Sequence, residues 1–128
     1  MMLAAAHDSG LARFDRTGLG PHAGALLDEL QRAAAANMPL AVTVLAATLV
    51  DVVANEEAGP AGVIDGVDFA YAGNKAALGW LRGRRNAILH HEGPTDGLMA
   101  EPDADVWQWQ DANRAVEALL GYLGDLTG

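Results

Sequence analysis

Three side chains that can handle an anion and a proton, Arg85, Asn86 and His90, follow one another closely in this 128-residue chain. A guanidinium group binds two oxygens of a phosphate or carboxylate at once, and an imidazole exchanges protons near neutral pH. An amide between them can orient either group. These residues belong to the stretch Arg82–Gly93, which holds three of the eight basic residues and two of the four histidines. We therefore take this stretch as the candidate functional site.

The charge of the whole chain limits what this stretch can bind. The formal net charge is −9, and phosphate contacts need Lys and Arg, so neither a broad nucleic-acid surface nor DNA binding is expected. A small basic pocket is compatible with this net charge, because four basic residues lie within eleven positions: Lys75, Arg82, Arg84 and Arg85. Chance clustering on a solvated helix face explains the same pattern about equally well.

The chain has no cysteine, which excludes disulfides, thiolate catalysis and cysteine-based zinc sites. His90, His91 and Glu92 offer another set of metal ligands, but consecutive histidines on a helix diverge by about 100° and cannot chelate one ion from one chain. We expect neither a metal nor another cofactor. The absence of cysteine is compatible with a reducing compartment, and we expect a cytoplasmic protein.

Helical periodicity dominates the rest of the chain. Apolar residues recur at three- and four-residue spacing over 21–36 and again from about Asp103 onward. Residues 39–57 are apolar nearly all round and predict a central, buried helix. Asn74 caps a helix that runs to about His91. We expect an all-α bundle of four to five helices that forms one domain over 21–128, with residues 1–20 only partly ordered.

The apolar helix at 39–57 carries polar residues whose burial requires partners. Thr43 and Thr48 can return their hydroxyls to the backbone carbonyl one turn back. A buried, ionised Asp51 needs a partner, for which an arginine of the candidate stretch is available, although a position on the solvated edge of the helix explains Asp51 equally well. Asp51 also interrupts the apolar run, which is too short to span a membrane, so no membrane association is expected.

Projection of the candidate helix at about 100° per residue places Arg85 inside its apolar stripe. The stripe consists of Ala77, Leu78, Leu81, Ile88 and Leu89. Asn86 and His90 share one face beside the edge of the stripe, and the side chains that point the other way are Arg84, His91 and Trp80. Because arginine is rarely buried unpaired, three interpretations are open. Arg85 pairs with an acid such as Asp51, lies at a subunit interface, or sits beside His90 in an anion pocket.

The run Arg85-Asn86-Ala87-Ile88-Leu89-His90 resembles the motif of the HEPN superfamily, in which an Arg followed by a polar residue, commonly Asn, precedes a His late in a helix of an α-helical bundle. The resemblance covers the motif strictly and residues 21–124 loosely. It implies a small all-α homodimer with the motif helix near the interface. It also implies RNA as substrate, an antitoxin or another protein as partner, and a role in toxin–antitoxin or antiviral defence systems or in RNA processing.

The register of the motif has alternatives, because Arg84 with His90, Arg84 with His91, and Arg85 with His91 also fit its spacing. Asn86 at the second position and the stripe position of Arg85 favour Arg85 with His90. The residues that remain as supporting candidates are Arg84, His91, Glu92 and Asp51. Arg85 and His90 lie about 140° apart around one helix, which is a physical reason to expect two facing helices and hence a dimer.

The reaction that the resemblance implies is metal-independent cleavage of RNA. The 2′-hydroxyl attacks the adjacent phosphodiester and leaves a 2′,3′-cyclic phosphate and a 5′-hydroxyl. His90 would be the general acid or base, Arg85 would stabilise the growing charge, and Asn86 would orient His90 or a phosphate. Some HEPN members are non-catalytic dimerisation or ligand-binding modules, and an acidic chain fits that class as well. We therefore expect an endoribonuclease, with a non-catalytic dimerisation or nucleotide/RNA-binding module as the alternative.

Overall fold

The structure, a computed structural model, describes residues 2–14, 16–58, 74–90, 98–99 and 102–127 of the chain. Within these ranges the backbone forms five α-helices, one 3₁₀ turn and no strand. The elements are α1 (Ala5–Arg13), η1 (Arg16–Gly18), α2 (Pro21–Ala35), α3 (Pro39–Ala58), α5 (Lys75–His90) and α6 (Ala104–Thr127). The prediction of an all-α bundle is confirmed. None of the described helices combines the length and hydropathy that a membrane-spanning segment requires.

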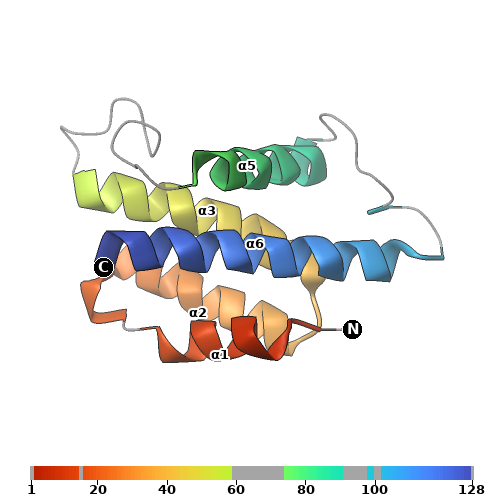
Figure 1. The fold of residues 1–128 in the computed structure, drawn as a ribbon, viewed down its shortest axis with the longest axis horizontal. Coiled ribbons are helices and arrows are strands. Elements are labelled where there is room, and N and C mark those ends of the chain that lie inside the picture. The colour runs from red at the N-terminus through yellow and green to blue at the C-terminus, as the bar shows by residue number, and fades with distance from the viewer. Residues whose placement is uncertain (1, 15, 59–73, 91–97, 100–101, 128) are drawn as a thin grey trace.

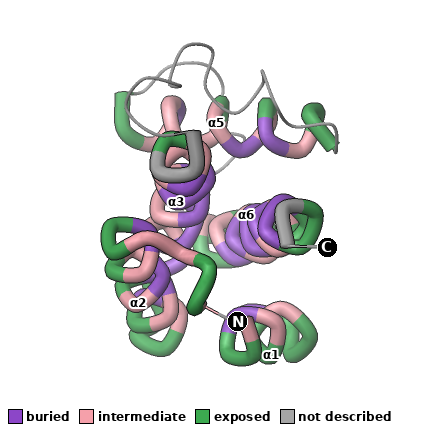
Figure 2. Tube along the Cα trace, turned by 90° about the vertical axis from the view of Figure 1, so that its left-hand side faces the viewer, coloured by how far each residue is buried: buried purple, intermediate pink, exposed green. Residues whose placement is uncertain are grey.

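Helix α3 lies at the centre of the bundle, in contact with α2, α5 and α6. Figure 1 shows α5 on one side of the pair formed by α3 and α6, and α1 and α2 on the other. The end-on view in Figure 2 shows the same layers, with buried positions turned inward. A helix that is apolar nearly all round is most stable where neighbours cover several of its sides, which explains the central position of α3.

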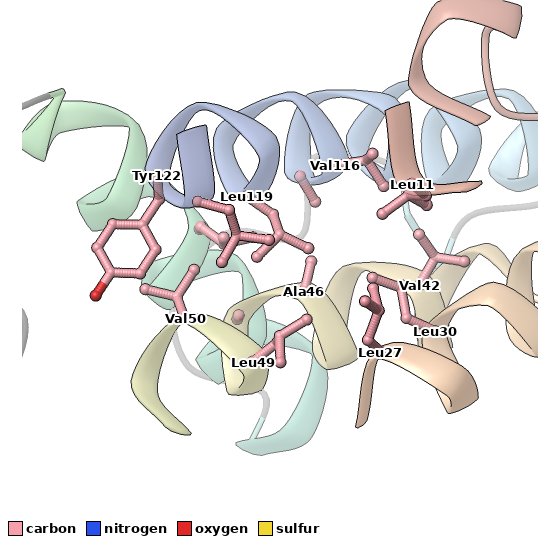
Figure 3. Close-up of a cluster of buried hydrophobic side chains, with 14 of the residues drawn as sticks. Leu11, Leu27, Leu30, Val42, Ala46, Leu49, Val50, Val116, Leu119 and Tyr122 are labelled. Atoms are coloured by element: carbon pink, nitrogen blue, oxygen red, sulfur yellow. The ribbon is translucent and has the colours of Figure 1, made fainter. Parts of the chain in front are cut away.

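Aliphatic side chains of several helices build the core (Figure 3). The labelled residues come from α1 to α3 and from α6, and all are at most 2% exposed: Leu11, Leu27, Leu30, Val42, Ala46, Leu49, Val50, Val116, Leu119 and Tyr122. Helix α5 adds Leu78 and Leu81, each 1% exposed. The large, fully buried side chains of α5 therefore lie in its first half, and the candidate motif lies in its second half.

Local signals place the helix ends near their predicted positions. Asn74 caps α5, because its Oδ1 accepts the N–H of Ala77 at 3.0 Å. Helix α2 ends in a Schellman motif, in which Asn37 adopts a φ of 64° and the N–H of Met38 donates to the carbonyl of Ala33 at 3.0 Å. Helices α2 and α3 each begin at a proline, where the missing N–H would have no helical partner anyway.

The two threonines of α3 differ in their hydrogen bonding. Thr48 Oγ1 donates to the carbonyl of Val44 at 2.9 Å, as predicted. Thr43 is 1% exposed, yet its hydroxyl has no hydrogen-bond partner among the described residues, so the same prediction is wrong for Thr43. The interior of the bundle therefore contains an unsatisfied hydroxyl.

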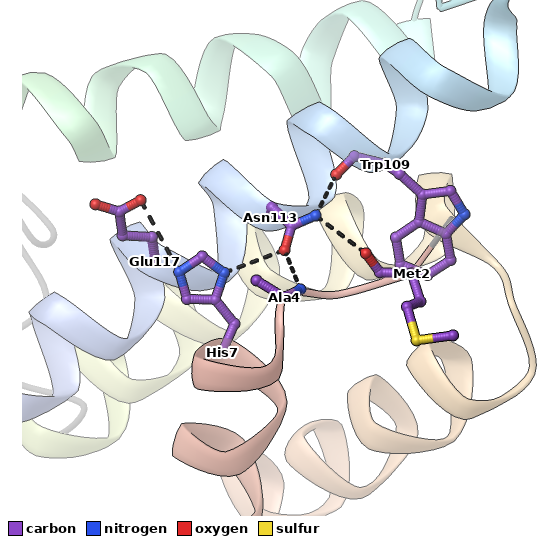
Figure 4. Close-up of polar contacts among 6 residues, drawn as sticks. All are labelled: Met2, Ala4, His7, Trp109, Asn113 and Glu117. Carbon is purple, nitrogen blue, oxygen red and sulfur yellow. Dashed lines mark hydrogen bonds and ion pairs between the residues drawn. The ribbon is translucent and has the colours of Figure 1, made fainter.

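The N-terminal segment, which was expected to be only partly ordered, forms α1 and η1 and is tied to α6 by Asn113 (Figure 4). Asn113 Oδ1 accepts the N–H of Ala4 at 2.6 Å and lies 3.1 Å from Nδ1 of His7. Asn113 Nδ2 donates to the carbonyl of Met2 at 3.3 Å and to that of Trp109 at 2.9 Å. Because Oδ1 can only accept, the proton of His7 must reside on Nδ1 for this contact to be a hydrogen bond.

Gly10 belongs to α1 and does not interrupt it. A Cβ at this position would lie 2.7 Å from Cδ1 of Leu120 on α6. The missing side chain therefore leaves the space that Leu120 occupies, and α1 can pack closely against α6. Gly10 is therefore a packing residue of the fold.

Candidate functional site

The candidate motif occupies the last two turns of α5. Arg85 and Asn86 are half-buried, whereas His90, the last residue of the helix, is exposed. Helix α5 contacts α3 along one edge and α6 along the other, so its arginines can reach acids on two neighbouring helices. The local environment of each motif residue follows from this double contact.

Asp51 of α3 holds two arginines of α5. Its Oδ2 accepts a hydrogen bond from Nη1 of Arg85 at 2.6 Å. Its Oδ1 lies 3.2 Å from Nε and 3.1 Å from Nη2 of Arg82. The three side chains are 22% to 29% exposed, so solvent partly screens their attraction. Of the two interpretations left open for Asp51, the structure shows the pairing with arginines of the candidate stretch, which explains how Arg85 fits into an apolar stripe.

Arg84 forms the corresponding pair on the opposite edge of α5. Its Nε lies 2.7 Å from Oδ2 of Asp111 on α6, and the two side chains are 12% and 15% exposed. The prediction that Arg84 points away from the packed side is therefore wrong, since Arg84 is more buried than Arg85. The projection failed because it assumed one packed side, whereas α5 packs against two helices.

Trp80 lies on the same edge as Arg84, between α5 and α6. The guanidinium of Arg114 on α6 stands 4.0 Å from the centroid of the Trp80 ring, and that of Arg84 stands 6.0 Å from it. Both distances allow cation–π attraction. The contact between α5 and α6 thus includes charged and aromatic side chains.

A line of residues runs along the solvent side of α5, which we call the outward face: Gly79, Gly83, Asn86 and His90. Their spacing keeps them within about 60° of one another around the helix. Gly79, Gly83 and His90 are exposed, and Asn86 is half-buried. A Cβ at either glycine would meet nothing within 4 Å. The outward face therefore combines accessible backbone with two polar residues of the motif.

The last turn of α5 departs from the predicted apolar stripe. Leu89, predicted to pack inward, is 54% exposed, whereas Ala87, which was outside the stripe, is 4% exposed. The prediction is wrong for Leu89. Its consequence is that an apolar side chain lies at the surface directly beside the exposed His90.

The structure joins some of the predicted site residues and separates others. Arg85 and Asp51 are in contact, and His90 lies on a different face of α5. Arg82, which we did not select from the sequence, shares Asp51 with Arg85. Its spacing of three residues from Arg85 was the signal, because residues at i and i+3 lie on neighbouring positions of one helix surface. The supporting candidates His91 and Glu92 lie outside the described residues.

The motif is not part of either pocket that described residues line. A groove of about 630 Å³ lies where the start of α5 meets α6, beside Arg114 and Asp125. A second pocket lies between the N-terminal segment and the end of α2. Within the described ranges no three histidine or acidic side chains have the arrangement of a metal site. His90 is therefore exposed outside these two pockets, and Arg85 and Asn86 are half-buried without lining either of them.

Comparisons of this chain with models of known protein families, with curated protein sequences and with solved structures find no match. The interpretation of the site therefore rests on its geometry and on the residues of its motif.

Proposed function

We propose that this chain is a HEPN-like, metal-independent endoribonuclease that acts as a homodimer. One observation carries the proposal. Helix α5 holds Arg85 in an ion pair with Asp51 and, about one and a half turns further on, presents His90 to solvent. An ordered guanidinium can stabilise the growing charge, and an accessible imidazole can transfer a proton, in metal-free cleavage of RNA.

In the proposed reaction His90 takes the proton of an RNA 2′-hydroxyl while the 2′ oxygen forms a bond to the adjacent phosphorus. Arg85 donates N–H groups to the phosphoryl oxygens, on which negative charge grows in the transition state. The bond from phosphorus to the 5′ oxygen then breaks, and that oxygen receives a proton from the histidine of the second protomer. The products are a 2′,3′-cyclic phosphate and a 5′-hydroxyl. Asn86, on the same face as His90, orients the imidazole or a phosphate.

Dimerisation along the outward face supports this chemistry. Such a dimer would bring the His90 of one protomer close to that of the other, whereas Arg85, about 140° from His90 around α5, reaches a phosphate between them only through the length of its side chain. A second copy of α5 can approach the backbone closely at Gly79 and Gly83, because neither has a side chain and the space beside them is open within the described structure. The exposed Leu89 adds apolar area beside His90.

The biological setting belongs to the same proposal and rests on the resemblance of the motif. It comprises RNA as substrate, a toxin–antitoxin or antiviral defence system, an antitoxin or another protein as partner, and a cytoplasmic location.

Cleavage of RNA in the absence of metal tests the proposal. Purified protein is incubated with total RNA in EDTA, and the ends of the products are mapped. We expect 2′,3′-cyclic phosphate and 5′-hydroxyl ends, and a loss of at least about 100-fold in rate for Arg85→Ala and for His90→Ala. Gln110→Ala, an exposed change on α6, serves as the control and keeps full activity. Absence of cleavage by the wild type, or cleavage that survives both substitutions, contradicts the nuclease.

A non-catalytic dimerisation or nucleotide/RNA-binding module is the second candidate. The ion pairs favour it, because Arg82, Arg84 and Arg85 all engage acids of the fold, as residues with a structural role would. The net charge of −9 also disfavours a general affinity for RNA. If the wild-type protein is a dimer that leaves RNA intact and retains a bound nucleotide, this candidate replaces the nuclease.

A further inference from the structure

The carboxylate of Asp51 binds two guanidinium groups, and each of its oxygens faces a different arginine. Oδ2 accepts from Arg85 and Oδ1 faces Arg82, at distances between 2.6 and 3.2 Å. Asp51 belongs to the central helix α3, and both arginines belong to α5. One acid therefore fixes two long side chains of α5 relative to the most enclosed helix of the bundle.

The ion pair leaves part of Arg85 available. Arg85 contacts Asp51 through Nη1, and within the described part of the chain its guanidinium makes no other hydrogen bond or ion pair. A guanidinium carries five N–H donors in a planar fork, so its Nε and Nη2 can still donate to a second anion. The side chain is 22% exposed, which lets an anion reach it from solvent.

Arg82 connects the ion pair to the face that carries His90. Around the helix, Arg82 is about 60° from Arg85 in the direction of the outward face, and Asn86 is about 40° further on. The arginines held by Asp51 and the polar residues of the outward face thus form one continuous surface of α5. A backbone of successive phosphates can lie along it, with one phosphate at the arginines and the next near His90.

We propose that Asp51 is a positioning residue that holds Arg82 and Arg85 as one phosphate-binding unit for single-stranded RNA. The choice of RNA as the ligand rests on the proposed function. The residues that this inference adds to the proposed site are Asp51 and Arg82. Two opposing effects follow from loss of Asp51. The site gains positive charge, which strengthens attraction for RNA only modestly at a solvent-screened position. Both arginines lose their fixed orientation, and ordering such long side chains upon binding is the larger cost.

Binding of a 2′-O-methyl oligoribonucleotide, which carries no nucleophilic 2′-hydroxyl, tests the unit separately from cleavage. A fluorescent single strand is titrated with full-length protein, and the dissociation constant is read from anisotropy. We expect Asp51→Asn to weaken binding about tenfold although it adds positive charge, and Asp51→Glu to restore most of it. Arg85→Lys, which keeps the charge but loses the fork, is expected to weaken binding to a similar extent.

The matched control is Asp111→Asn, which breaks the ion pair between α5 and α6 on the other edge of the helix. It lowers the stability of the fold in urea but leaves oligonucleotide binding unchanged. If Asp51→Asn binds as tightly as the wild type or more tightly, Asp51 only neutralises charge and the inference is overturned. Arg85→Lys with wild-type affinity overturns it too, even where Asp51→Asn does not fold.

The outcomes separate this inference from the proposed function. If the wild type binds the oligonucleotide with the predicted dependence on Asp51, Arg82 and Arg85 but does not cut RNA, the phosphate-binding unit is supported and the proposed nuclease activity is contradicted. If the wild type cuts RNA and Asp51→Asn has the same affinity and cleavage rate, the nuclease activity is supported and the phosphate-binding unit is contradicted. A wild type that does not bind the oligonucleotide overturns the unit outright.

Discussion

Thr43 and Thr48 carry the same hydroxyl group in one helix, but only the hydroxyl of Thr48 is hydrogen-bonded within the described structure. Thr48 donates to the carbonyl of Val44, whereas Thr43 is 1% exposed and has no partner in the described structure. A buried hydroxyl without a hydrogen bond costs free energy, because it has lost the bonds to water that it makes in the unfolded chain. Thr43 therefore weakens the fold at a position where valine has the same shape.

Thr43→Val is expected to raise the free energy of unfolding by about 1 kcal/mol, since it removes the unsatisfied group and keeps the volume. Thr48→Val is the matched control and is expected to lower it by about 0.5 kcal/mol, because it removes a satisfied hydrogen bond. Urea unfolding followed by circular dichroism measures both. Equal destabilisation by the two changes would show that the hydroxyl of Thr43 has a partner in solution.

Single residues also show which ion pairs of the candidate site could be inferred from the sequence. Asp51 needed a cationic partner in an apolar helix, and one of the arginines predicted for it, Arg85, is its partner. The half-buried pair of Arg84 and Asp111 was missed, because no rule of spacing links residues on two helices whose relative orientation is unknown. Pairing within a helix follows from its periodicity, whereas pairing between helices requires the packed fold.

At the scale of elements, α5 has an anchored first half and a more exposed end. Leu78 and Leu81 are buried, whereas Leu89 and His90 are exposed. Gly79 and Gly83 lie on the outward face, in the interior of the helix, where glycine costs up to about 1 kcal/mol relative to alanine. Nothing within the described structure occupies the space beside them. The packing of the described residues therefore does not explain these two glycines.

Gly79→Ala and Gly83→Ala are expected to stabilise the monomer by up to about 1 kcal/mol each and to weaken self-association. The added methyl groups would hold a second α5 away from the backbone. Urea unfolding at low protein concentration and sedimentation equilibrium measure the two effects. Gly24→Ala on α2, where a Cβ also meets nothing within 4 Å, should stabilise without changing association. Association that is unaffected by Gly79→Ala and Gly83→Ala contradicts a dimer through the outward face.

At the scale of the whole molecule, Asn113 links the two ends of the chain. Its amide makes contacts with Met2, Ala4 and His7 in addition to Trp109 of its own helix. Leu3 and Leu11 are at most 6% exposed, so the segment that Asn113 fixes is also part of the core. Loss of the amide should therefore loosen a substantial element.

Asn113→Ala is expected to lower the free energy of unfolding by about 1 kcal/mol, since the part-buried contacts with His7 and with the carbonyl of Trp109 are lost, whereas water can replace the exposed ones with Met2 and Ala4. It should also expose the N-terminal segment to proteolysis under native conditions. Gln110→Ala, one turn earlier on the exposed side of α6, should stay within about 0.5 kcal/mol of the wild type. A stability of Asn113→Ala within that same range would mean that water replaces the amide.

The helix bounds, which depend on nearby residues, could be predicted from the sequence. The contacts between segments that are distant in the sequence could not. The prolines, Asn74 and the apolar spacing placed α2, α3, α5 and α6 within a few residues of their observed bounds. The attachment of residues 2–14 through Asn113 was not predicted, because the partners of Asn113 in this segment lie more than 100 residues away in the sequence. The role of Gly10 was not predicted for the same reason, since it depends on Leu120.

The three tryptophans lie at three different depths, and this distribution gives the protein an intrinsic optical signal. Trp109 is fully buried, Trp107 is 44% exposed, and Trp80 is stacked under Arg114 between α5 and α6. An indole in an apolar interior emits at shorter wavelength than one in water, and a cation on its face shifts and quenches the emission. Fluorescence of Trp80, read in a chain whose other two tryptophans are replaced by phenylalanine, would therefore report displacement of α5 from α6 in real time without an added label.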